Sequence, residues 1–149
     1  MDYLEIAVRL VLATVVGGSI GLNRDLHGKP TGVRTLGLVG LGSALVVLAA
    51  TGFTVDDPDW DAISRAIQGV MTGIGFLGAG VIIRRAGETE IQGLTTAACI
   101  WLTSCLGMVC GVGGWIAVVI AVPLLFLVLT LGASIEKAVH RRWGQQNDD

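Results

Sequence analysis

Charged residues cluster with glycine and proline in one short segment between two apolar stretches. The segment contains one acid, three cations and a proline-containing turn, and its candidate functional residues are Arg24, Asp25, Lys29, Pro30, Gly32, Arg34 and Thr35. A guanidinium can bind a carboxylate through two parallel hydrogen bonds, so a bidentate pair between Arg34 and Asp25 is expected across the turn. Two interpretations stay open: a functional motif at the membrane surface, or a positive loop that only sets membrane orientation.

A second segment combines small residues with two hydroxyls where another apolar stretch begins. Its candidate residues are Gly93, Thr95 and Thr96, within the run Gly-Leu-Thr-Thr-Ala-Ala. Hydroxyls near a helix start can cap free backbone N–H groups. The alternative is that the small residues let backbone groups approach a ligand or partner.

The apolar stretches carry no Asp, Glu, Lys or His near their middles, whereas proton relays and ion pathways usually depend on such residues. The polar side chains at depth are Ser43, Gln68, Thr72, Thr103 and Ser104. These groups suit hydrogen bonds between helices better than magnesium, which prefers carboxylates. We find no nucleophile–base pair, metal-ligand cluster or cofactor motif, and therefore expect a non-enzymatic protein with no catalytic residue, metal site or cofactor.

The composition indicates a membrane protein, since 52% of the 149 residues are hydrophobic and 15% are charged. Five apolar stretches have spanning length, at about 6–22, 35–53, 65–83, 94–112 and 115–135. The sequence thus predicts an all-α, multi-pass bundle of five transmembrane helices forming a single domain over residues 1–149. The formal net charge of −2 provides no basic field for nucleic acid.

Orientation is predicted from lysine and arginine, which concentrate in short cytoplasmic loops. Eight of the ten fall on one side of the five stretches, and only Arg9 and Arg65 on the other. The amino terminus should therefore lie outside and the carboxyl terminus in the cytoplasm. The Arg9 side chain is expected to extend to the interface. The outer loop carries Asp56, Asp57, Asp59 and Asp61, either as a solvated surface or as a weak site for divalent cations.

Glycines recur through the third apolar stretch, at positions that predict close helix packing. They are Gly69, Gly73, Gly75, Gly78 and Gly80, and Trp101 of the fourth stretch is added as a packing residue. Small residues let neighbouring helices approach closely in a membrane. We expect this stretch to be the central packing helix and to support a homo-oligomer.

A weak internal repeat appears when the chain is shifted by 61 residues. Residues 24–45 then align without gaps with residues 85–106, and six of the 22 positions are identical. Either the first four stretches form two hairpins of the same topology, or apolar glycine-rich segments match by chance.

The same segments resemble the signature blocks of the MgtC/SapB family of bacterial inner-membrane proteins. The matching blocks are Gly21–Asp25 with Lys29–Thr35, Gly73–Ile82, and Gly93–Ala98 with Trp101, in the family's order and spacing. The resemblance covers nearly the whole chain.

This resemblance implies a regulator or adaptor that helps cells adapt to magnesium limitation or related stress. The alternative is a transporter or channel for magnesium or another small solute. The resemblance also implies the lipid bilayer and a membrane protein such as the ATP synthase as partners. Virulence members of the family carry a soluble carboxyl-terminal domain with no counterpart here, and Asn in place of Thr95. We therefore expect the membrane core, rather than the virulence role, to be shared.

Overall fold

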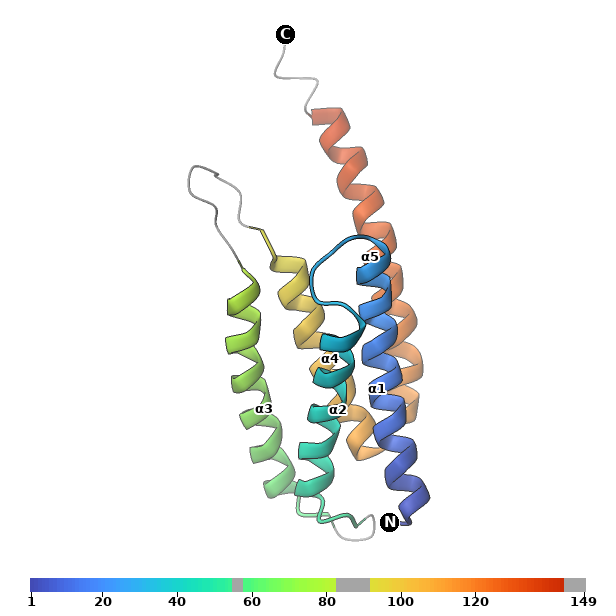
Figure 1. Cartoon of the computed structure of the whole chain (residues 1–149), viewed down its shortest axis with the longest axis vertical. Coiled ribbons are helices and arrows are strands. Elements are labelled where there is room, and N and C mark those ends of the chain that lie inside the picture. The colour runs from blue at the N-terminus through green and yellow to red at the C-terminus, as the bar shows by residue number, and fades with distance from the viewer. Residues whose placement is uncertain (55–57, 83–91, 144–149) are drawn as a thin grey trace. The chain divides into compact units, whose positions relative to one another are not determined.

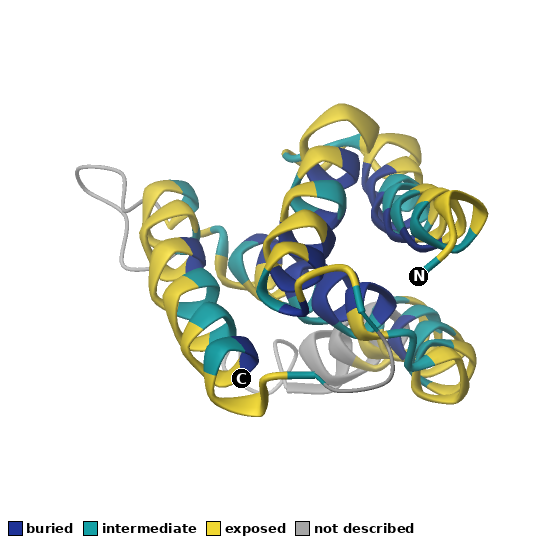
Figure 2. Cartoon of the chain, turned by 90° about the horizontal axis from the view of Figure 1, so that it is seen from below, coloured by how far each residue is buried: buried dark blue, intermediate teal, exposed yellow. Residues whose placement is uncertain are grey.

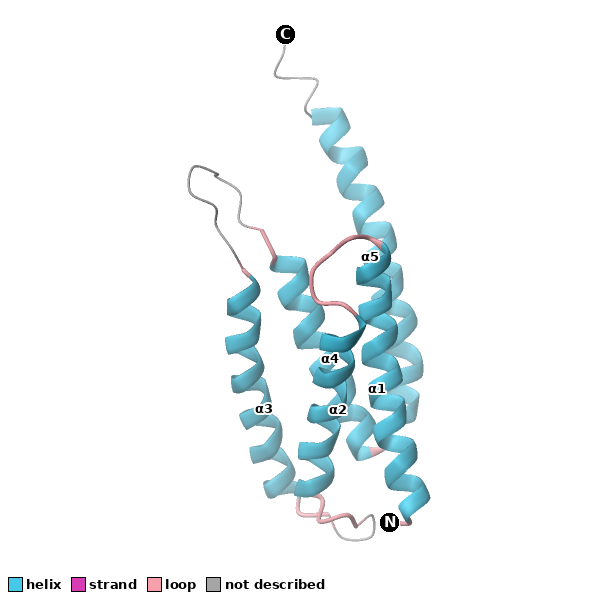
Figure 3. Cartoon of the chain, viewed as in Figure 1, coloured by secondary structure: helices cyan, strands magenta, loops and turns pink. Residues whose placement is uncertain are grey.

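The computed structural model describes the backbone of residues 1–54, 58–82 and 92–143, and their side chains except those of residues 133–134 and 136–143. These residues form five helices: α1 (Tyr3–Leu26), α2 (Val33–Ala50), α3 (Trp60–Val81), α4 (Leu94–Val112) and α5 (Trp115–Trp143). Helices and loops account for the whole described chain, which contains no β-strand (Figure 3). The predicted all-α class is confirmed over this part of the chain.

The helices lie where the apolar stretches predicted them, and α4 has the predicted bounds at both ends. Four helices (α1, α2, α4 and α5) are long and apolar enough to cross a membrane. The described part of α3 does not reach the same apolarity, because Arg65 and Gln68 are strongly hydrophilic and its five glycines add no apolar side chain. The bilayer environment is therefore supported by four candidate spans.

The chain divides into two units, residues 1–115 and 116–149, each described by itself. The described residues of the second unit continue α5, which includes Pro123 within its helix. The first unit holds α1 to α4 and all of the candidate functional residues.

Two helices, α2 and α4, form the centre of the first unit. Helix α2 packs most extensively on α1 and then on α4, while α3 contacts α4 and, less extensively, α2. Buried residues gather on the facing sides of α1, α2 and α4, and the outer surfaces are exposed (Figure 2). In Figure 1, α3 runs along the side of this group. The prediction that α3 is the central packing helix is therefore wrong for the described chain.

Close backbone approach is provided by glycines of α1, α2 and α4 instead. A Cβ added to Gly40 would lie 2.5 Å from the carbonyl oxygen of Ala13, and one added to Gly21 would lie 2.6 Å from Gly32. A Cβ on Gly107 would lie 3.0 Å from the Gly40 Cα. These helices touch backbone to backbone, as small residues allow in membrane bundles.

The predicted packing glycines of α3 have no such neighbours among the described residues. A Cβ added to Gly69, Gly73, Gly75 or Gly80 would meet nothing within 4 Å, and one added to Gly78 would touch only the Ala97 Cβ at 3.7 Å. Trp101 is half exposed. The glycine face of α3 is open within the chain.

The internal repeat is supported by equivalent contacts in the two hairpins. A Cβ on Gly17 of α1 would collide with the Leu36 carbonyl of α2; 61 residues further on, Gly78 of α3 faces Ala97 of α4. The hairpins α1–α2 and α3–α4 thus pack in the same register.

The two halves also meet at equivalent residues. The hydroxyls of Ser43 and Ser104, which are 61 positions apart, form a buried hydrogen bond of 2.8 Å between α2 and α4. Both helices start at the same end of the bundle (Figure 1). Self-pairing of equivalent positions is what a two-fold relation produces, so the repeat has an approximate two-fold axis running along the bundle between α2 and α4.

Candidate functional site

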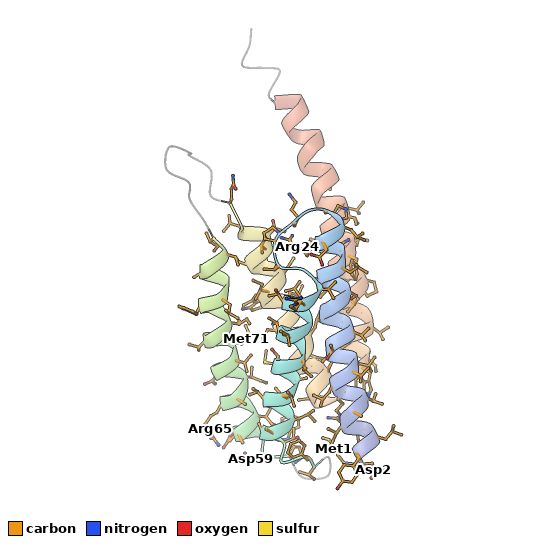
Figure 4. All side chains as sticks on the ribbon, viewed as in Figure 1. Met1, Asp2, Arg24, Asp59, Arg65 and Met71 are labelled. Atoms are coloured by element: carbon orange, nitrogen blue, oxygen red, sulfur yellow. The ribbon has the colours of Figure 1, made fainter. Side chains whose placement is uncertain are left out.

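The candidate residues converge at the end of the bundle that carries the α1–α2 loop, which we call the α1–α2 end. In Figure 4, Arg24 lies at this end, whereas Asp59 and Arg65 lie at the opposite end. Three elements meet there: the last turn of α1, the loop with the first turn of α2, and the first turn of α4.

Arg24 joins the two segments predicted from the sequence. It lies in the last turn of α1, is 5% exposed, and donates a hydrogen bond from Nη2 to the Thr96 hydroxyl in the first turn of α4. Thr96 is itself buried. The Nε atom of Arg24 is buried without a hydrogen-bond partner among the described residues. The site thus has a buried guanidinium that contacts a neutral hydroxyl.

Asp25 has a different partner from the one predicted. Its Oδ2 atom accepts a hydrogen bond of 3.0 Å from the backbone N–H of Val33, the first residue of α2. Arg34 is exposed and forms no ion pair with the described residues. The predicted Arg34–Asp25 pair is wrong, because the carboxylate is held by the free N–H at the start of the helix.

Gly32 is required by this arrangement. A Cβ at Gly32 would collide with the Asp25 carboxylate, so a side chain there would displace the acid from the start of α2. The backbone N–H of Lys29 donates to the Arg24 carbonyl at 3.0 Å, which closes the turn after α1. The predicted loop residues thus shape the backbone around Asp25.

The remaining predicted residues are placed at the edge of the site. Pro30 lies exposed in the loop, and Thr35 is exposed in the first turn of α2. Gly93 precedes α4 with a φ of 96°, and Thr95 is exposed in its first turn. None of these four described residues forms a hydrogen bond with the Arg24 side chain.

The predicted surroundings of Arg9 are wrong. Arg9 is 4% exposed rather than extended to the interface; it donates from Nη1 to the Gly111 carbonyl at 2.7 Å and pairs with Glu5 at 2.5 Å. It therefore caps the carboxyl end of α4. The i,i+4 spacing of Glu5 and Arg9 was the available sequence signal.

The geometry of the α1–α2 end offers chemistry for recognising negative charge. The described residues contain no cluster of His, Cys, Asp or Glu that could hold a metal ion. What the α1–α2 end presents is one buried cation beside hydroxyls and backbone N–H groups, a set that binds negative charge.

Comparison with known proteins identifies one matching family and several similar sequences. A model of the MgtC family matches residues 10–138. Protein SrpB of Synechococcus elongatus is 48% identical over 122 residues, 76% of this chain and 67% of SrpB. The putative magnesium transporter YhiD of Escherichia coli K12 is 43% identical over 113 residues, 73% of this chain and 52% of YhiD.

Protein MgtC of Salmonella typhimurium LT2 is 36% identical over 106 residues, which are 71% of this chain and 43% of that protein. The matched regions thus span from less than half to about two thirds of these relatives. No solved structure matches the chain significantly.

Proposed function

The chain belongs to the MgtC family, and from that premise we propose that it is a non-enzymatic regulator or adaptor in the bacterial inner membrane, acting in adaptation to magnesium limitation. One relative is named a putative magnesium transporter, which makes transport the alternative function. A membrane protein partner such as the ATP synthase is part of the same proposal.

The charge inside the bundle favours regulation over magnesium transport. The charged side chains buried in the described unit are Arg9 and Arg24, near the two ends of α1. A divalent cation on a path through this bundle would pass two buried positive charges, and such repulsion is weakly screened away from water. This observation carries the proposal.

The experiment separates the two functions. The gene is expressed in a bacterium deleted for its own family member, and growth in low magnesium is measured. The purified protein in liposomes is then assayed for magnesium flux against empty vesicles. We expect restored growth without flux above the empty vesicles; flux above them would establish the transporter instead, and failure to restore growth would contradict the regulator.

We further propose five spans with the amino terminus outside. Helix α3 has 22 residues, so it is about 33 Å long and can cross a hydrocarbon core of about 30 Å. Single cysteines at Lys29 and Asp59, in a background without native cysteines, should react with an impermeant reagent from opposite sides, Asp59 from outside. Labelling of both from one side would contradict five spans.

Self-association through the open face of α3 is also part of the proposal, since small residues favour helix pairing in membranes. Gly73 is exposed and has open space around it, so Gly73→Leu should leave the fold intact while abolishing crosslinking between copies. Gly42→Leu, also in open space but on α2, is the matched control. Equal crosslinking in both variants would exclude this face as the contact.

A further inference from the structure

We propose that Arg24 and the first turn of α4 form a binding site for a phosphate oxyanion, supplied either as free phosphate or as a phospholipid headgroup. The inference goes beyond the proposed regulatory function and does not depend on it. It rests on two features of the α1–α2 end and one of the sequence: a buried cation without a carboxylate partner among the described residues, a helix start without a cap among them, and an acid in one half of the sequence repeat that the other half replaces by alanine.

The first feature is the contrast between the two buried arginines of α1. Arg9 lies at the carboxyl end of α4, where the helix dipole is negative, and contacts both the Glu5 carboxylate and a backbone carbonyl. Arg24 lies at the amino end of the same helix, where the dipole is positive, and its one side-chain hydrogen bond among the described residues goes to the Thr96 hydroxyl. No carboxylate of the described residues pairs with it.

A buried guanidinium without a counter-ion is costly, and more so beside a positive helix end. The Nε atom of Arg24 is buried and has no partner among the described residues. Thr96 accepts the hydrogen bond from Nη2, so its own hydroxyl proton remains free to donate. Both groups are therefore poised to donate to an oxyanion.

The second feature is the start of α4. The first backbone bond within the described helix runs from the Ala97 N–H to the Gly93 carbonyl, and Gly93 has no side chain to cap the turn. The N–H groups of Leu94, Thr95 and Thr96 consequently have no acceptor among the described residues. Free N–H groups at a helix start, combined with the dipole, favour phosphate.

The third feature is the comparison with α2 through the repeat. The free N–H at the start of α2 is compensated by the Asp25 carboxylate, bonded to Val33. A shift of 61 residues places Ala86 at the position equivalent to Asp25, and Gly93 at that of Gly32. In the sequence, the first half of the repeat thus has an acid where the second half has alanine. We infer that an external oxyanion takes the place of that carboxylate at α4.

The test measures thermal unfolding of the purified protein, first in phosphate-free neutral detergent. Inorganic phosphate is titrated at constant ionic strength against chloride, and in a parallel series the protein is placed in phosphatidylcholine nanodiscs with or without phosphatidylglycerol. For the wild type we expect a saturable rise in Tm of roughly 5–10 °C at 100 times Kd. A rise with inorganic phosphate identifies the free ion, and a rise only with phosphatidylglycerol identifies the headgroup.

Variants make the result specific. Arg24→Gln should abolish the rise and should not lower the Tm without ligand, since it removes an unpaired buried charge. Arg34→Gln removes an exposed cation at the same end and should respond like the wild type. If Arg24→Gln does not fold, Thr96→Val, which keeps the shape and removes the hydroxyl, should weaken half-saturation about tenfold.

Three results would overturn the proposal. The first is a wild-type Tm that neither phosphate nor phosphatidylglycerol changes. The second is an undiminished response in a folded Arg24→Gln variant or, where that variant does not fold, in Thr96→Val. The third is an equal loss of response in Arg34→Gln, which would indicate diffuse surface charge rather than a site.

Discussion

Gly40→Ala is expected to destabilise the bundle, whereas Gly42→Ala, two residues away on the same helix, is expected to stabilise it slightly. A Cβ at Gly40 would lie 2.5 Å from the Ala13 carbonyl of α1, and the Gly40 Cα itself lies against Gly107 of α4. Both neighbours are backbone and cannot rotate away. Overpacking of this kind costs about 1–3 kcal/mol, whereas alanine in an unobstructed helix position gains up to about 1 kcal/mol over glycine.

The measurement is thermal unfolding of both variants in one detergent. With a chain of this length, the two substitutions should separate the Tm values by roughly 5 °C or more. Gly73→Ala on α3 is a second control, since its Cβ also meets open space. If Gly40→Ala were as stable as Gly42→Ala, the three-helix contact at Gly40 would not exist in the folded protein.

The positions of the helices could be predicted because apolar length is a local property of the sequence. The stretch at 94–112 became α4 with unchanged bounds, and its limiting glycines, Gly93 and Gly113, both adopt positive φ. Such residues mark helix ends through their own backbone preference. No knowledge of neighbouring helices was needed.

The role of the glycine-rich helix could not be predicted, because a close helix contact depends on both partners. The tight contact of α1 with α2 brings Ala13 against Gly40. The residues 61 positions later are Ile74 and Trp101, which are much larger. The equivalent contact of α3 with α4 cannot close to backbone distance, although α3 contains more glycines than α1. The number of glycines in α3 alone therefore led to the wrong prediction of the central helix.

The sequence included Arg24, Asp25 and Thr96 among the candidate residues but did not predict which groups they pair with. The short distance along the sequence favoured an ion pair between Asp25 and Arg34. In the structure, Asp25 instead accepts a hydrogen bond from the Val33 N–H, and Arg24 donates one to the Thr96 hydroxyl. The contact between Arg24 and Thr96 joins residues 72 positions apart. Only the packing of α1 on α4 could reveal it, and no local pattern encodes that packing.

Arg9→Met is expected to lower the free energy of unfolding by about 2–3 kcal/mol, because a buried charged hydrogen bond and a helix cap are lost together. The guanidinium donates to the Gly111 carbonyl at 2.7 Å. It also covers Gly113, the residue that ends α4, so closely that a Cβ there would lie 2.7 Å from Nη2. Methionine fills much of the same volume but leaves the carbonyl groups of the last turn and the Glu5 carboxylate without their donor.

Thermal unfolding in detergent checks this prediction, with Arg65→Met as the matched control. Arg65 is exposed and lies near the same end of the bundle (Figure 4), so its substitution should change stability by less than about 0.5 kcal/mol. The double variant Glu5→Gln with Arg9→Met should recover part of the loss, since it removes the carboxylate left unpaired. Equal Tm values for Arg9→Met and Arg65→Met would show that the carboxyl end of α4 needs no cation, and the assignment of Arg9 as its cap would fail.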